Sequence, residues 1–170
     1  MLAAIAIPEF DAGAAGWIAA LRAAHDPQQD RVPPHVTLVF PQAADEASLL
    51  ARLQAVAQAT QPFAAGFDRL GRMDDSYNPK YRHLNVLHAD AAGAAALTVL
   101  HAALNAVPSP DYAAHVTVAR FGAVYCAKAL ERQLGGSALR PVLSARFSGL
   151  QLLRLENGAV RVLADLPFAD

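Results

Sequence analysis

The chain has 170 residues, of which 54% are hydrophobic, and this is enough apolar material for one compact domain with its own core. Its net charge of −1 excludes a protein whose main task is to coat long nucleic acid, because that affinity comes from neutralising many phosphates. Cys126 is the only cysteine, so no intrachain disulfide can form, and we expect a cytoplasmic protein.

The first half of the chain is predicted to run strand, helix, strand, helix, strand. An apolar run at the N-terminus favours a buried strand, and a Pro-rich loop separates an alanine-rich helix from the next strand. The predicted elements are, in order, a strand over residues 2–7, a helix over 14–25, a loop over 27–34, a strand over 36–40, a helix over 45–60 and a strand over 63–67.

The second half follows the same plan after an irregular connection over residues 69–82. The predicted elements are a strand over 84–88, a helix over 91–106, a loop over 108–112, a strand over 116–121, a helix over 127–134 and strands over 142–152 and 160–166. The pair Asn157-Gly158 is a strong signal for a hairpin turn near the C-terminus.

The two halves align without a gap when the two His-x-Thr motifs are superimposed. In this alignment His35-Val36-Thr37 falls on His115-Val116-Thr117, and the Ala-Gly-Ala-Ala segment 12–15 falls on 92–95. We therefore predict an internally duplicated domain of two pseudo-symmetric lobes, with repeat units of about 1–68 and 83–150 and a C-terminal hairpin over 150–166.

The two His-x-Thr motifs are the main candidates for chemistry. Side chains two apart on a strand point to the same face, so His35 projects with Thr37 and His115 projects with Thr117. If the lobes face each other across a cleft, the two imidazoles lie on opposite sides of one small group. The other possibility is that both motifs cap a buried network of hydrogen bonds.

Cleavage of a phosphodiester needs these groups. A neutral imidazole takes a proton from the attacking oxygen, and a protonated imidazole gives one to the departing oxygen. Thr37 and Thr117 are then placed to donate hydrogen bonds to the non-bridging oxygens. The scheme needs no cofactor and no metal, and neither motif has a second ligand at a usual metal spacing.

The segments PPHVTLVF (33–40) and AHVTVARF (114–121) resemble the paired signatures of the two-histidine (2H) phosphoesterase superfamily, which includes the bacterial 2'-5' RNA ligase and RNA 2',3'-cyclic phosphodiesterase group. The resemblance covers essentially the whole chain. It implies an α+β, bilobal, internally duplicated fold in which two antiparallel-rich sheets flank a central cleft, with helices on the outside. It also implies action on cyclic phosphates or phosphodiesters, often at RNA ends.

The same resemblance implies that Phe40 walls or stacks on the base or sugar and that Arg120 holds the phosphate. Each residue stands five positions after its histidine, an odd spacing that faces away on a regular strand, so its entry into the cleft needs a bulge or the strand's end. The alternative places Phe40 in the core and Arg120 in a surface ion pair.

Two further residues are candidates for the cleft wall. In the gap-free alignment, Ala3 and Ile5 correspond to His83 and Asn85, which share a face of the second half's strand. The first strand lacks the aromatic side chain that often reaches the cleft in the family. His83 and Asn85 are therefore predicted to contribute to substrate binding, although a histidine partly in solvent is an equal possibility for His83.

The predicted function is hydrolysis of a 2',3'-cyclic phosphate on an RNA end or nucleotide by a monomer. Alternatives are 2'-5' ligation, attack on another small cyclic phosphoester, and non-catalytic binding of RNA ends. A membrane partner is not expected, because no apolar stretch is long enough to span a bilayer.

Overall fold

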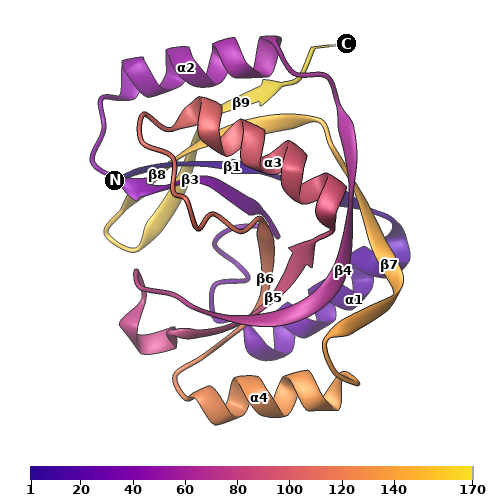
Figure 1. Cartoon of the computed structure of the whole chain (residues 1–170). Coiled ribbons are helices and arrows are strands. Elements are labelled where there is room, and N and C mark those ends of the chain that lie inside the picture. Colours follow the sequence, from indigo (N-terminus) through magenta and orange to yellow (C-terminus); the bar gives the residue numbers. More distant parts are fainter. Residues whose placement is uncertain (170) are drawn as a thin grey trace.

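The computed structural model describes residues 1–169, which form two antiparallel sheets and four α-helices (Figure 1). A four-stranded sheet has the order β3-β1-β8-β9, and its strands are β1 (Leu2–Ala6), β3 (Val36–Gln42), β8 (Gly149–Glu156) and β9 (Ala159–Pro167). A five-stranded sheet has the order β2-β7-β4-β5-β6, and its strands are β2 (Glu9–Phe10), β4 (Phe63–Asp74), β5 (His83–Ala89), β6 (His115–Phe121) and β7 (Ala138–Phe147). The predicted α+β class is confirmed.

The helices α1 (Ala12–His25), α2 (Glu46–Gln58), α3 (Ala91–Leu104) and α4 (Val124–Gln133) pack against these sheets, and a 3-10 turn, η1 (Pro79–Tyr81), precedes β5. In Figure 1, α2 and α4 lie at opposite ends of the molecule. α2 contacts β8 and β9, α4 contacts β4, β5 and β6, α1 contacts β6, and α3 contacts β3, β4 and β5. No helix in the described residues is long and apolar enough to cross a membrane.

One hydrophobic core joins both sheets. Its largest buried side chains include Phe67 from β4, Phe147 from β7 and Leu53 from α2. Every residue of β1 is buried, because Leu2, Ala4 and Ala6 face this core while Ala3 and Ile5 pack with Leu153 on the other face. This two-sided burial explains why β1 reads as a continuous apolar run in the sequence.

Helix starts are fixed by aspartates. The side chains of Asp11, Asp45 and Asp90 accept hydrogen bonds from the backbone of the first turns of α1, α2 and α3. Gly93 in α3 lies so close to β4 that an added Cβ would stand 2.6 Å from the Cβ of Ala65. Glycine at this position therefore lets α3 approach the sheet.

The two halves repeat the same elements, but not at one constant offset. The two helices α1 and α3 lie one position closer together along the chain than the two motifs do. The buried Ala14, Ile18 and Leu21 of α1 recur in α3 at Gly93, Leu97 and Leu100. The first strands are one position further apart, because Ile5 pairs with Thr37 whereas Val86, and not Asn85, pairs with Thr117. The predicted gap-free alignment is therefore wrong by one position in both of these elements.

Two predicted element boundaries are also wrong. The connection over 69–82 is irregular only in its second part, because β4 continues to Asp74 and pairs with β5 up to His83. The single strand predicted over 142–152 is two strands in different sheets, β7 and β8, separated at Ser148. The first error arises because charged residues on the half-exposed end of β4 weaken the apolar pattern, and the second arises because apolar residues continue on both sides of Ser148.

Candidate active site

The two His-x-Thr motifs come together where the sheets meet. His35 immediately precedes β3 and Thr37 lies in it, at one edge of the four-stranded sheet. His115 and Thr117 belong to β6, an edge strand of the five-stranded sheet. The two edge strands contact each other. All four side chains line one cavity of about 770 Å³, so the expected juxtaposition is present.

Each histidine is fixed by the same backbone contact. Nδ1 of His35 lies 2.8 Å from the carbonyl oxygen of Pro33, and Nδ1 of His115 lies 2.7 Å from that of Ala113. A carbonyl oxygen only accepts hydrogen bonds, so each Nδ1 carries a proton and donates it. The Nε2 atom of each neutral ring is thereby left free to accept a proton.

A β-bulge follows each motif. Along β3, Ile5 pairs with Thr37 and Ala4 pairs with Val39, which leaves Leu38 as the extra residue. Along β6, Val86 pairs with Thr117 and Asn85 pairs with Ala119, which leaves Val118 as the extra residue. Two consecutive buried residues therefore follow each threonine.

The bulges decide where the fifth residue after each histidine points. An extra residue in a strand reverses the alternation of faces, so Phe40 returns to the side of His35 and Arg120 returns to the side of His115. Both side chains line the cavity. The odd spacing in the sequence is thus compatible with one continuous wall on each side of the cleft.

The environment lowers the pKa of both motif histidines, though each ring keeps part of its surface open to the cavity. For His35, loss of solvation in the cleft wall lowers the pKa to about 4, and the charges of Arg120 and Arg22 act in the same direction. For His115, the same desolvation and the charge of Arg120 also lower the pKa, while the hydrogen bond to Ala113 and the nearby Asp75 carboxylate raise it. Asp75 thus favours the protonated form of His115.

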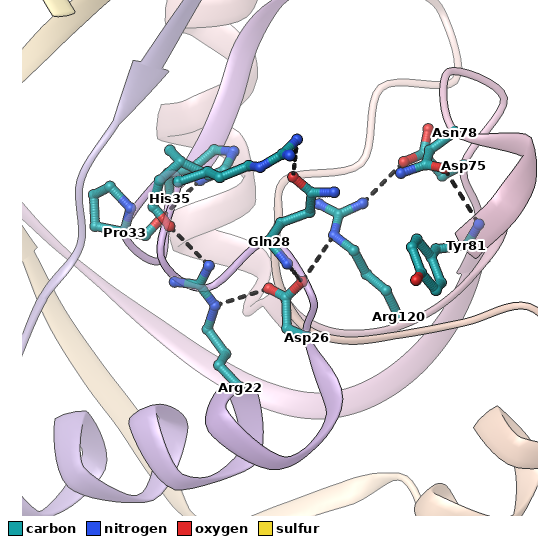
Figure 2. Close-up of polar contacts among 11 residues, drawn as sticks. Arg22, Asp26, Gln28, Pro33, His35, Asp75, Asn78, Tyr81 and Arg120 are labelled. Atoms are coloured by element: carbon teal, nitrogen blue, oxygen red, sulfur yellow. Dashed lines mark hydrogen bonds and ion pairs between the residues drawn. The ribbon is translucent and has the colours of Figure 1, made fainter. Parts of the chain in front are cut away.

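Arg120 is held by a cluster of charged side chains (Figure 2). Its Nε lies 3.3 Å from Oδ1 of Asp26 and its Nη1 lies 2.9 Å from Oδ2 of Asp75. Asp26 also pairs with Arg22, whose Nε lies 2.9 Å from Oδ2 of Asp26. Arg22 donates a further hydrogen bond of 2.7 Å to the carbonyl of Val32, in the loop that leads to His35. The end of α1 therefore connects Arg120 to the loop before the first motif.

Phe40 stacks on an aromatic ring from the other side of the cleft. The rings of Phe40 and Tyr77 are almost parallel, with 6.0 Å between their centroids and an interplanar angle of 7°. Both residues line the cavity. Tyr77 lies in the connection between β4 and η1, within the segment over 69–82 that was predicted to be irregular.

The expectation that Asn85 lines the cleft is wrong. Asn85 is fully buried, and its Nδ2 donates a 3.0 Å hydrogen bond to the carbonyl of Ala127 in α4. The neighbouring Leu84, which pairs with Arg120, lines the cavity instead. The cause is that β1 and β5 are one residue further apart along the chain than the two motifs are. A shift of one residue turns every side chain of a strand to the other face.

His83 is displaced from the cavity for the same reason. Its Nδ1 lies 2.9 Å from Oδ1 of Asp74, and the residue is not among those that line the cavity. Ala3 and Ile5, the residues used to place His83 and Asn85, do line it.

Three residues at the site were not identified from the sequence. Asp26 and Asp75 contact Arg120, and Tyr77 faces Phe40, but all three lie outside the motif strands. The spacing of Arg22 and Asp26, one helical turn apart, was the only local signal for any of them. Among residues 1–169, no group of three or more His, Cys, Asp or Glu side chains is arranged to hold a metal ion.

The fold and the paired motifs define a two-histidine phosphoesterase. Residues 10–159 match the family model described as the 2'-5' RNA ligase superfamily, and the chain therefore belongs to that superfamily. The predicted resemblance of the chain to this superfamily is confirmed. Membership makes the chain a phosphoesterase or RNA ligase-like enzyme.

Solved structures share the fold along nearly the whole chain. TT0787 of Thermus thermophilus is 18% identical with a TM-score of 0.62, and the match covers 98% of this chain and 97% of that one. Usb1 of Kluyveromyces marxianus is 11% identical with a TM-score of 0.62 and 98% coverage of both chains. E. coli LigT, in a complex with NADP+, is 15% identical with a TM-score of 0.59 and covers 99% of this chain and 97% of its own. No curated protein sequence matches the chain significantly.

Proposed function

We propose that the chain hydrolyses 2',3'-cyclic phosphates on RNA ends or nucleotides by metal-independent acid–base catalysis with His35 and His115. The observation that carries this proposal is the pair of imidazoles on equivalent bulged edge strands, each with Nδ1 donating to the backbone and Nε2 left for proton transfer. The shared cavity of about 770 Å³ is large enough for a nucleotide.

In this mechanism one neutral imidazole takes a proton from water as its oxygen attacks phosphorus. The bond between phosphorus and the 3' oxygen breaks, and the protonated second imidazole gives its proton to that oxygen, which leaves a 2'-phosphate. Thr37 and Thr117 donate hydrogen bonds to the non-bridging oxygens, where negative charge increases in the transition state. Arg120 adds a charge-assisted hydrogen bond to the phosphate.

We assign the base to His35 and the acid to His115. A base must be neutral at working pH, and the pKa of His35 is lowered to about 4. An acid must be protonated, and Asp75 raises the pKa of His115 against the effect of burial. The surroundings lower the pKa of both residues, but only His115 has a nearby carboxylate, Asp75, that opposes this effect, and this difference is the basis of the assignment.

The nucleoside is proposed to bind beside Phe40, whose ring, stacked on Tyr77, provides an aromatic wall for a base. Nucleotide ligands in relatives of the same fold support a nucleotide or an RNA end as the ligand. E. coli LigT has been crystallised with 3'-AMP and with ATP, and Kluyveromyces marxianus Usb1 with uridine monophosphate.

A second candidate is the reversible formation of a 2'-5' linkage, which the family description favours. The two reactions share the same acid and base, because a ribose hydroxyl takes the place of water as the attacking group. Supplying an RNA with a free 5' hydroxyl beside the cyclic-phosphate end would separate them. Ligation yields a longer product, whereas hydrolysis leaves the RNA length unchanged.

The direct test is turnover of adenosine 2',3'-cyclic phosphate and of a short RNA ending in a cyclic phosphate, in EDTA, with identification of the product isomer. We expect a 2'-phosphate from both, and we expect His35→Ala and His115→Ala to remove nearly all turnover. His83→Ala is the matched control, since His83 does not line the cavity. Near-wild-type turnover in both motif variants, or loss of turnover in EDTA, contradicts the proposal.

A further inference from the structure

Arg120 contacts two carboxylates that differ in burial. The side chain of Asp26 is 1% exposed and is not part of the cavity wall, whereas the side chain of Asp75 is 15% exposed and lines the cavity. Figure 2 shows Arg120 between the two, with Asp26 on the side of α1 and Asp75 on the other. One carboxylate is therefore shielded from any ligand and the other is open to it.

Asp26 is fixed at the end of α1. Its Oδ2 accepts from Arg22, its Oδ1 accepts from the backbone N–H of Gln28 at 3.0 Å, and the same Oδ1 lies nearest to Arg120. Arg22 is also buried, with 6% of its side chain exposed. These contacts use protein groups on every side, so Asp26 has no freedom to leave Arg120 without breaking a buried ion pair.

Asp75 is held less firmly. It lies in the connection after β4, and its Oδ1 accepts from the backbone N–H of Tyr77, while its Oδ2 contacts only Arg120 among the polar contacts of the described residues. A carboxylate oxygen at 2.9 Å from a guanidinium nitrogen has the geometry of a phosphate oxygen bound to arginine. Asp75 therefore stands where a phosphate oxygen would bind.

The charges of the cluster agree with this interpretation. Arg22, Asp26 and Arg120 together carry one positive charge, and Asp75 neutralises it. A cyclic phosphodiester also carries a single negative charge, so it can replace Asp75 without leaving a net charge in the partly buried cluster. A buried charge without a partner is strongly unfavourable, which favours one anion at this position at a time.

We propose that Asp75 is an internal substitute for the substrate phosphate on Arg120, displaced when substrate binds, and that Asp26 is the positioning residue that keeps Arg120 aimed into the cavity. This inference rests on the proposed function for the identity of the phosphate ligand. It assigns opposite effects to two aspartates on the same arginine. Asp75 competes with phosphate, and Asp26 supports phosphate binding.

The test compares Asp75→Asn, Asp26→Asn and the control Asp74→Asn. Asp74 also lines the cavity and pairs with His83 and Arg82, so Asp74→Asn removes the same charge from the same segment without touching Arg120. The ligands are inorganic phosphate and adenosine 2'-monophosphate, with affinity measured by calorimetry. The kinetic readout is KM and kcat for adenosine 2',3'-cyclic phosphate.

We expect Asp75→Asn to tighten phosphate binding and to lower KM by about three- to fivefold, the size of a partly exposed ion pair, whereas kcat should fall because the Asp75 carboxylate no longer raises the pKa of His115. Asp26→Asn is expected to weaken binding by about tenfold or more, because Arg120 loses its buried partner. Asp74→Asn should bind like the wild type. A general electrostatic effect would instead move Asp74→Asn and Asp75→Asn together, and this result overturns the proposal.

Unchanged or weaker phosphate binding in Asp75→Asn also overturns the proposal. The melting temperature of Asp26→Asn shows whether that variant folds, and Asp75→Asn alone tests the proposal if it does not. Failure of the proposed function looks different. If no cyclic phosphate is turned over but the two variants still shift phosphate affinity in opposite directions, the reaction is wrong and the exchange on Arg120 stands. If turnover occurs but the phosphate affinities do not shift, the proposed reaction stands and the exchange on Arg120 is wrong.

Discussion

The two halves of the active site share a backbone and differ in what surrounds it. In both, the histidine donates Nδ1–H to the carbonyl two residues earlier, and a bulge follows the threonine. The fifth residue is then Phe40 in one half and Arg120 in the other. The shared geometry leaves Nε2 of each ring facing the same cavity, and the different surroundings place Arg120 and the Asp75 carboxylate beside the second motif.

The helices that support the motif strands show the same contrast. α1 contacts β6 and α3 contacts β3, so each helix supports the motif strand of the other half. At equivalent positions in their last turns, α1 carries Arg22 and its cap Asp26, and α3 carries His101 and its cap Asn105. The charged pair holds the side chain of Arg120.

The neutral pair holds the backbone at the other bulge. His101 Nδ1 and Asn105 Nδ2 both donate to the carbonyl of Leu38, at 2.8 and 2.9 Å, and Tyr112 donates to the carbonyl of Thr37 at 3.0 Å. The ring of His101 stacks on Tyr112 with 3.9 Å between centroids. Each helix end therefore carries a polar pair, and the two pairs differ in the group that they support.

Loss of either motif histidine is expected to have the largest effect on the reaction rate. His35→Ala and His115→Ala are each expected to lower kcat/KM for a cyclic phosphate by about 10²- to 10⁴-fold, the range of a positioned acid or base. Rate measurements on each single variant and on the double variant check this. Because the two groups act in one step, the double variant should lose much less than the product of the single losses, and full additivity would contradict joint action.

A smaller effect separates the fifth residues. Arg120→Met is expected to lower kcat/KM by about 10- to 100-fold through loss of a charge-assisted hydrogen bond. Phe40→Leu should lower it by about fivefold, mainly through KM, because only stacking is lost. Steady-state kinetics with a cyclic nucleotide and with a cyclic phosphate that lacks a base distinguish the two. An effect of Phe40→Leu that persists without a base would contradict stacking.

The helix-end pairs should differ in stability rather than in chemistry. Arg22→Met removes the closer cationic partner of the buried Asp26, leaves only the 3.3 Å contact with Arg120, and is expected to lower the free energy of unfolding by about 3–5 kcal/mol. His101→Phe leaves the Leu38 carbonyl and the Ser109 N–H with fewer partners and should lower it by about 1–3 kcal/mol. Urea unfolding of both variants tests the order. A larger loss in His101→Phe would show that the charged pair contributes little.

Local sequence patterns were sufficient for the motif strands and for the face that carries each histidine and threonine. They also indicated that Phe40 and Arg120 reach the cleft only through a bulge or a strand end, and a bulge is observed in both strands. They failed for His83 and Asn85, because the shift of one position between β1 and β5 arises in the loops that join the elements, where residue patterns do not fix length.

The residues that contact Arg120 and Phe40 could not be predicted from the sequence, for another reason. Asp26, Asp75 and Tyr77 act through contacts with strands that are distant along the chain, such as the ion pair between Asp75 and Arg120. Such contacts depend on how the two sheets meet, and no periodic pattern records them. From the sequence alone, an aspartate in a loop is predicted to be solvated, because the pattern does not identify its ion-pair partner.

The most direct test of the account is the pH dependence of kcat/KM for adenosine 2',3'-cyclic phosphate in EDTA. The base is lost as pH falls through the pKa of His35, about 4, and the acid is lost as pH rises through the pKa of His115, which lies below 6.5. The two-histidine mechanism therefore predicts a bell-shaped profile with its maximum on the acidic side of neutrality. A single titration step, or a rate that disappears in EDTA, would contradict the two-histidine mechanism.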